Sequence, residues 1–140
     1  MAAYGTTKFK YEDTEIDVKA PWPRLTMAEA VKKYTPTHED FDACKTIEDA
    51  RAIADRLHVE YSEFDGFGKI LAECFDAYVE EHLIQPVHIT HHPIEVSPLS
   101  KLDPADPRYT IRFESYIYGR ELANGFSELN DPIDQRQRFE

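Results

Sequence analysis

Residues 109–129, YTIRFESYIYGRELANGFSEL, decide the fold of this 140-residue chain. Apolar and polar side chains alternate over residues 109–117, which is typical of a β-strand with one buried face. Tyr118 and Gly119 form a two-residue turn signal, and residues 120–129 then return along the first strand. The stretch therefore predicts an antiparallel β-hairpin.

Two carboxylates of this hairpin are expected on one face. The turn puts Tyr116 opposite Glu121, and Glu114 lies two residues before Tyr116 on the same side of the strand. Glu114 and Glu121 are then diagonal neighbours that repel each other unless a cation lies between them. Mg²⁺ suits such a site, because it takes one or two carboxylates together with substrate phosphates. The alternative is a pair of solvated carboxylates near Arg112 and Arg120.

The returning strand offers a second set of side chains. Asn124, Phe126 and Glu128 alternate on one face and supply an amide, an aromatic wall and a carboxylate. This combination suits a ligand that carries an ammonium group on an aliphatic stem. Glu121 and Asn124 differ in parity, so a bulge or a sharp twist must bring them to one pocket. Gly125 is the expected place for it.

Upstream of the hairpin the pattern is helical. Residues 8–18 predict a short hairpin, and the sequence at 20–25 predicts a connector with two prolines. Residues 26–83 then predict a compact insertion of three helices, the first beginning at Thr26 with capping-box spacing and the second at Thr46.

The second half of the chain returns to strands. Residues 86–129 predict antiparallel strands, within which residues 94–99 are extended and residues 100–108 form a loop. The last ten residues, 131–140, predict the start of a helix that stops at Glu140 without a capping residue. We therefore expect an α+β chain, with an antiparallel sheet and a small helical insertion, that is a piece of a longer protein.

The composition excludes several classes of protein. The chain has 16 Lys and Arg against 27 Asp and Glu, a net charge of −11, whereas phosphate binding needs a basic face. We therefore expect no direct grip on nucleic acid. No stretch approaches the ~20 apolar residues of a membrane span, and no signal core begins the chain. Two cysteines, Cys44 and Cys74, make no disulfide framework, so we expect a soluble cytoplasmic protein with no membrane partner.

Three histidines, His88, His91 and His92, lie within five residues of one another. A structural zinc site needs further ligands at suitable spacing, and the sequence offers no such pair. The pattern therefore favours ordinary strand and turn histidines. The chain also has no glycine-rich phosphate loop.

Residues 112–140, RFESYIYGRELANGFSELNDPIDQRQRFE, resemble the catalytic domain of class II lysyl-tRNA synthetases. Residues 82–101 and 24–34 resemble preceding parts of the same family, and ANGFSELND at 123–131 is the most specific stretch. The resemblance implies a segment of a class II antiparallel sheet with a helical insertion, between the second and third class-defining motifs.

The resemblance also implies roles for the residues of the hairpin. Glu114 and Glu121 match the family's carboxylates for Mg²⁺ with ATP, and Asn124, Phe126 and Glu128 match its lysine pocket. The parent protein would be a homodimer that activates lysine with ATP to lysyl-adenylate and transfers it to tRNA(Lys). Because the flanking motifs are not in this chain, it holds no complete catalytic set, and we expect it to be inactive alone.

Two other interpretations stay open. A paralogue that attaches lysine or β-lysine to a translation factor shares ELANGF, although Ser127 and Asn130 favour the tRNA ligase. The other is a stand-alone, non-catalytic module that binds an amino acid or a protein partner. The observation that would discriminate this second interpretation is whether the native polypeptide ends at Glu140.

Overall fold

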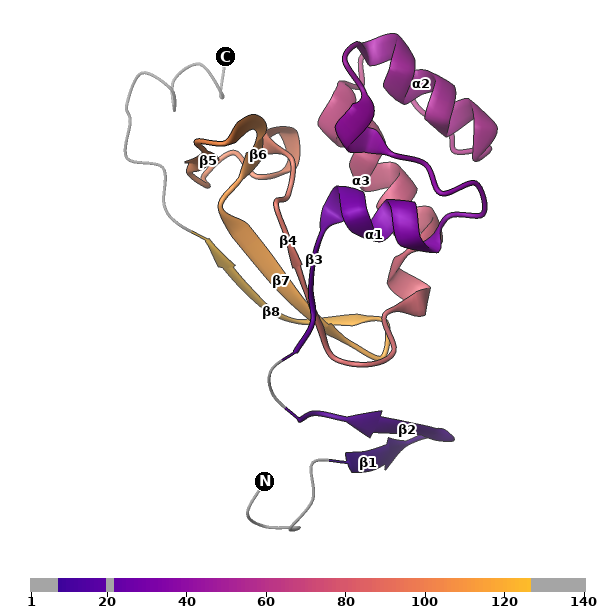
Figure 1. The fold of residues 1–140 in the computed structure, drawn as a ribbon, viewed down its shortest axis with the longest axis vertical. Helices are drawn as coiled ribbons and strands as arrows, with labels where there is room; N and C mark the ends of the chain where they lie inside the picture. The colour runs from indigo at the N-terminus through magenta and orange to yellow at the C-terminus, as the bar shows by residue number, and fades with distance from the viewer. Residues whose placement is uncertain (1–7, 20–21, 127–140) are drawn as a thin grey trace.

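A computed structural model describes residues 8–19 and 22–126 of the chain. Strands β1 (Lys8–Tyr11) and β2 (Thr14–Asp17) form an antiparallel hairpin, which lies beyond one end of the main sheet (Figure 1). The Gln85 side chain ties this hairpin to the body. It accepts a hydrogen bond from the backbone N–H of Asp17 and donates one to the carbonyl of Glu15.

The main sheet has the order β3-β4-β7-β8. Its strands are β3 (Arg24–Thr26), β4 (Val87–Thr90), β7 (Arg112–Ile117) and β8 (Arg120–Phe126). Strands β3 and β4 are parallel and the other pairs are antiparallel. The expectation of a connector at 20–25 was therefore wrong at its end, where β3 begins. A parallel pair needs a long crossover, and the helical insertion provides it.

Three helices form that insertion: α1 (Met27–Tyr34), α2 (Ile47–Arg56) and α3 (Phe67–Tyr78). Thr26 caps α1 by accepting from the Glu29 N–H at 3.0 Å, which is one half of the predicted capping box. Thr46 caps α2 in a complete capping box. Short 3₁₀ turns η1 (Phe41–Ala43) and η2 (Glu80–His82) extend the insertion.

The core lies between the helices and one face of the sheet (Figure 1). Val87, Ile89 and Tyr116 point into it from the sheet, and the rings of Phe75 and Tyr116 lie 6.0 Å apart. Cys74 is also fully buried, and burial raises the pKa of its thiol to about 12. Cys74 is therefore a core thiol of α3.

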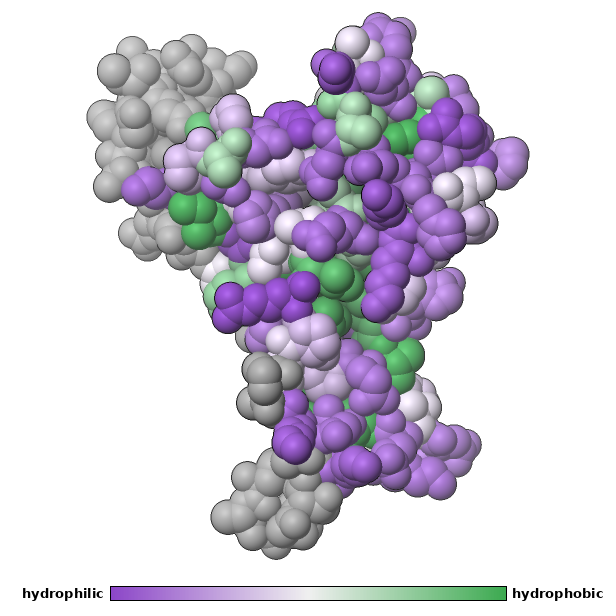
Figure 2. Space-filling view, viewed as in Figure 1, coloured by the Kyte–Doolittle hydropathy of each residue, from purple (hydrophilic) through white to green (hydrophobic). Residues whose placement is uncertain are grey.

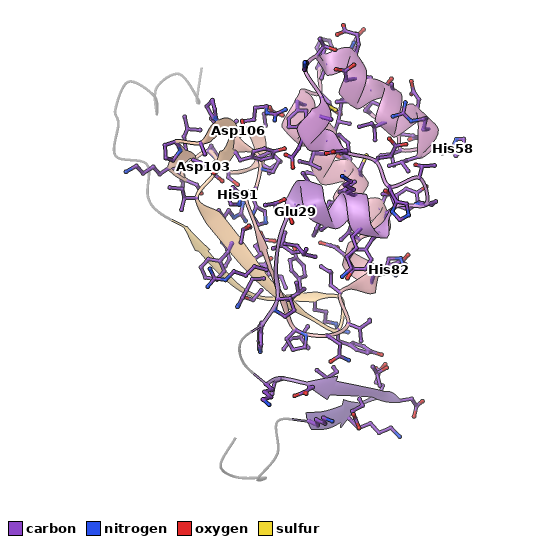
Figure 3. All side chains as sticks on the ribbon, viewed as in Figure 1. Glu29, His58, His82, His91, Asp103 and Asp106 are labelled. Carbon is purple, nitrogen blue, oxygen red and sulfur yellow. The ribbon has the colours of Figure 1, made fainter. Side chains whose placement is uncertain are left out.

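Between β4 and β7 the chain makes short elements that the sequence did not predict. Ile94–Val96 is a 3₁₀ turn, η3, rather than an extended segment. Strands β5 (Leu102–Asp103) and β6 (Asp106–Thr110) form a small hairpin where a loop was expected. His91 reaches this hairpin, with its Nε2 2.9 Å from an oxygen of Asp103 (Figure 3).

The surface over the helices is mostly hydrophilic, and apolar side chains emerge between the helices and the β1–β2 hairpin (Figure 2). Within residues 8–19 and 22–126, every helix is too short or too polar to cross a bilayer. The helix expected at 131–140 lies outside the described residues.

Candidate functional site

The candidate site is carried by the β7–β8 hairpin, and its tight turn fixes the register. Tyr118 and Gly119 have positive φ angles of 54° and 69°, as a type I′ turn requires. Tyr116 faces Glu121 across the ladder, which confirms the predicted turn.

One residue of β8 is extra in this register. Tyr116 faces Glu121, but the preceding residue, Ser115, faces Ala123. Leu122 is therefore left between two paired positions as a β-bulge. The bulge reverses the parity of the rest of β8 relative to its beginning.

The bulge brings the predicted residues to one face of the hairpin. Beyond it, Glu114 faces Asn124 directly, so both lie on the same side of the sheet. The prediction that Gly125 makes the bulge was wrong. Gly125 instead faces Phe113, and a Cβ atom there would lie 2.5 Å from the Phe113 ring.

Glu114 is nearly buried, with 8% of its surface exposed, yet both of its oxygens have polar partners. Arg112 donates from Nη2 to Oε1. The Tyr116 hydroxyl donates to Oε2 at 2.6 Å, and Nε2 of His92 lies 3.4 Å from the same oxygen. The last distance is longer than that of an ordinary hydrogen bond.

These partners keep Glu114 ionised. Burial alone would raise its pKa, but the nearby His92 ring, the Tyr116 hydroxyl and the Arg112 guanidinium together outweigh burial. The pKa of Glu114 is thereby lowered to about 2. The same arrangement raises the pKa of Tyr116, through burial first and then its hydrogen bond to Glu114. Glu114 is therefore ionised at neutral pH and paired with the Arg112 guanidinium.

Two further carboxylates approach the site from the helical insertion. Burial raises the pKa of Glu80, and the negative charges of Asp76, Glu114 and Glu121 raise it further. Asp76, on α3, is exposed, whereas Glu80, in η2, is half-buried and lies within electrostatic range of Glu114 and the exposed Glu121.

The predicted lysine-pocket residues are described to different extents. Asn124 is exposed, and its Oδ1 accepts a hydrogen bond from Arg112 Nε at 2.9 Å. The backbone of Phe126 pairs with that of Arg112. Glu128 lies outside the described residues.

The described part of the chain does not form a closed metal-ligand cage at this site. Within residues 8–19 and 22–126, no group of three or more His, Cys, Asp or Glu side chains could hold a metal ion. Mg²⁺ differs from zinc here, since it keeps several waters and is held by one or two carboxylates with substrate phosphates. The donor set of Glu114 and Glu121 fits that mode of binding.

Comparison with known proteins gives the family. The family model of class II tRNA synthetases (D, K and N) matches residues 1–140. The chain belongs to the class II tRNA synthetases of the D, K and N group.

Curated relatives of this class II synthetase segment carry the name Lysine--tRNA ligase. The Moorella thermoacetica protein is 54% identical over 138 residues, which cover 99% of this chain and 28% of that protein. Those of Thermoanaerobacter pseudethanolicus and Bacillus subtilis are each 50% identical, over 96% and 97% of this chain and 27% of their own length. The chain thus spans little more than a quarter of the relatives it matches.

The three histidines of the synthetase segment have different surroundings. His88 hydrogen-bonds the Ser115 hydroxyl at 2.7 Å, and His91 pairs with Asp103. His92 is buried against Glu114, and its ring nitrogens have no hydrogen-bond partner among the residues described. Sequence reasoning missed its place at the site, because the approach depends on how the chain turns after β4.

A cavity of about 680 Å³ lies largely on the opposite face of the sheet from Glu114. Its lining includes His88, Phe113 and Gly125, which alternate with the residues of the candidate site. Arg112 lines it as well. The carboxylates Glu114 and Glu121 do not line this cavity, so the hairpin chemistry and the cavity are separate features.

Proposed function

We propose that this chain is a segment of a class II lysine–tRNA ligase. In the parent protein the β7–β8 hairpin supplies the carboxylates for Mg²⁺ with ATP and side chains of the lysine pocket. The observation that carries this proposal is the bulge at Leu122, which puts Glu114, Glu121 and Asn124 on one face. The names of the relatives support the choice of lysine.

The parent reaction has two steps. The lysine carboxylate attacks the α-phosphate of ATP, which forms lysyl-adenylate and releases pyrophosphate. The lysyl group then passes to the 3′ end of tRNA(Lys), and AMP leaves. Such a site works by holding the reactants in position and by neutralising charge, rather than by acid–base chemistry.

Mg²⁺ is the proposed cofactor, and when bound it neutralises phosphate charge on ATP. Glu114 and Glu121 would hold it. Glu114 suits this task because its partners keep it ionised and fix its orientation. Glu121 is exposed and free to adjust towards an incoming ion.

Lysine recognition is assigned to Asn124, Phe126 and Glu128, with Glu128 as the partner of the side-chain ammonium. A charged partner rejects amino acids that lack the ammonium, because its own charge would be left unpaired.

We also propose that the parent is a homodimer in the cytoplasm and that its tRNA contacts are made by other parts of the protein. The net charge of −11 supports the last point.

The metal assignment can be tested in a chimeric ligase, in which this chain replaces the matching segment of the Bacillus subtilis relative. Glu114→Gln and Glu121→Gln should each raise the Mg²⁺ concentration for half-maximal lysine-dependent ATP–pyrophosphate exchange by about tenfold or more. Glu73→Gln is the control, since Glu73 pairs with Lys69 on the surface of α3. An unchanged Mg²⁺ requirement in both hairpin variants would contradict the assignment.

The lysine assignment has its own test in the same chimera. Glu128→Gln should cost roughly 3–5 kcal/mol of lysine recognition, because it leaves the lysine ammonium without a charge partner. The readout is the KM for lysine at saturating Mg²⁺–ATP, with the exposed Glu63→Gln as control. An unchanged lysine affinity would refute the role of Glu128.

A further inference from the structure

Arg112 occupies a central position at the candidate site. Its guanidinium is largely buried, with 18% of the side chain exposed. Nε donates to Asn124 Oδ1 at 2.9 Å, and Nη2 donates to Glu114 Oε1. Nη1 donates to the hydroxyl of Ser97 at 2.7 Å and to the carbonyl of Val96 at 3.2 Å. All three nitrogens of one rigid fork are thus engaged, by three different parts of the chain.

The contact with Asn124 fixes the direction of its amide. Arginine has only donors, so the amide must turn its oxygen towards Arg112. The NH₂ group of Asn124 then points away from the guanidinium and is left for a ligand.

The contact with Glu114 decides where that carboxylate can take a further partner. A carboxylate has about four lone-pair sites. Oε2 already meets the Tyr116 hydroxyl and the His92 ring, whereas Oε1 meets Arg112 alone among these neighbours. The open site on Glu114 is therefore on the oxygen that Arg112 orients.

The contacts of Arg112 Nη1 with Val96 and Ser97 connect the hairpin to α3 through the segment 93–97. Within this segment, Glu95 accepts a hydrogen bond from the Lys69 N–H at 2.8 Å, in the first turn of α3. A Cβ atom on Gly68 would lie 2.4 Å from Cβ of Pro93, so helix and segment are in close contact. Arg112 is thereby held in place from outside the hairpin.

We propose that Arg112 is a positioning residue that couples the two halves of the site. It holds the metal carboxylate Glu114 and the lysine-pocket amide Asn124 with one guanidinium, so that filling one subsite changes the affinity of the other. This inference rests on the proposed function, which assigns the two residues to different ligands. Lysine at this position would keep the charge but, as a point charge, could not replace the fork.

The test measures lysine affinity by calorimetry in the chimeric ligase. Titrations are made with and without Mg²⁺ and the α,β-methylene analogue of ATP, which cannot form the adenylate. The ratio of the two dissociation constants is the coupling. We expect about fivefold or more in the unsubstituted chimera, the lower end of usual coupling. Arg112→Lys should bring the ratio below about twofold, while Arg120→Lys, at the exposed end of the same hairpin, should keep it.

The outcomes distinguish a failure of the proposed role of Arg112 from a failure of the proposed function. A ratio near one in the unsubstituted chimera, or an unchanged ratio in Arg112→Lys, overturns the role of Arg112 but leaves the proposed function standing. Absence of lysine binding in a folded, unsubstituted chimera rejects the proposed function itself. Should Arg112→Lys fail to fold, Ser97→Ala removes one anchor of the fork and must still lower the ratio, and an unchanged ratio there overturns the inference.

Discussion

Glu114 shows how a buried carboxylate can stay charged. Its burial opposes ionisation, yet the surrounding donors lower its pKa to about 2. Two of these donors, Arg112 and Tyr116, come from its own strand at a spacing of two residues. The His92 ring, which comes from the segment after β4, is a further neighbour and lies 3.4 Å from Oε2.

The charge of Glu114 makes stability depend on pH. Its folded pKa lies below its ordinary value of 4.5, so the unfolded chain binds the proton more readily. The stabilisation is complete above about pH 4.5 and is lost as the pH falls towards about 2. We expect a loss of up to about 3 kcal/mol in the free energy of unfolding over this window, since one pKa unit is about 1.4 kcal/mol.

Urea unfolding at a series of pH values checks this. Glu114→Gln should flatten the profile between pH 4.5 and 2, while Glu121→Gln, on the same face but exposed, should keep it. Glu39 and Asp106 also have lowered pKa values, so some acid sensitivity remains in every variant. A profile for Glu114→Gln as steep as that of the unsubstituted chain would contradict the account.

The residues of the site could be predicted in part. The two-residue turn and the alternation of side chains along the strands were sufficient to predict that Glu114 and Glu121 lie on one face. The bulge was expected at Gly125 because glycine marks bulges. The structure uses that glycine to admit the Phe113 ring, and the bulge falls at Leu122, which carries no local signal for it.

At the scale of elements, the segment 93–97 connects the helical insertion to the hairpin. Its contact with α3 depends on Gly68, which leaves room for the Pro93 ring. Glu95 supplies the hydrogen bond at the N-terminus of α3, where Gly66 offers no side-chain cap. The sequence predicts this third helix of the insertion but does not show which residue caps it from a distance.

Substitution of Gly68 tests this contact. Gly68→Ala should lower the free energy of unfolding by about 1–3 kcal/mol, because the new methyl group meets the rigid Pro93 ring. Gly66→Ala should cost less than about 1 kcal/mol, since its methyl group meets only the movable carboxylate of Glu95. Chemical denaturation of both variants gives the comparison, and equal effects would speak against a rigid contact at Gly68.

The long helices were predicted well and the short elements were not. Helices α2 and α3 repeat their apolar stripe over several turns, and α2 begins at a recognisable capping box. Strand β3, turn η3 and strand β5 are two or three residues long. Elements of that length have no period to detect, and tertiary contacts decide their conformation.

At the scale of the whole molecule, the chain is acidic and matches one part of a larger family architecture. It spans little more than a quarter of its curated relatives. The α+β class and the family could be inferred from the sequence. The order of helices and strands indicates the class, and the family-specific stretch at 123–131 lies within this chain. The open cavity on the far side of the sheet could not, since it depends on how the β5–β6 segment packs.

The measurement that tests the central claim most directly is lysine-dependent ATP–pyrophosphate exchange by the chimeric ligase and by the isolated chain. The account predicts that the chimera catalyses exchange and that this exchange depends on lysine and Mg²⁺. The rate should lie within about tenfold of that of the Bacillus subtilis relative, which corresponds to about 1.4 kcal/mol in the activation barrier. It predicts no exchange by the isolated chain. A folded chimera without lysine-dependent exchange, or exchange by residues 1–140 alone, would contradict it.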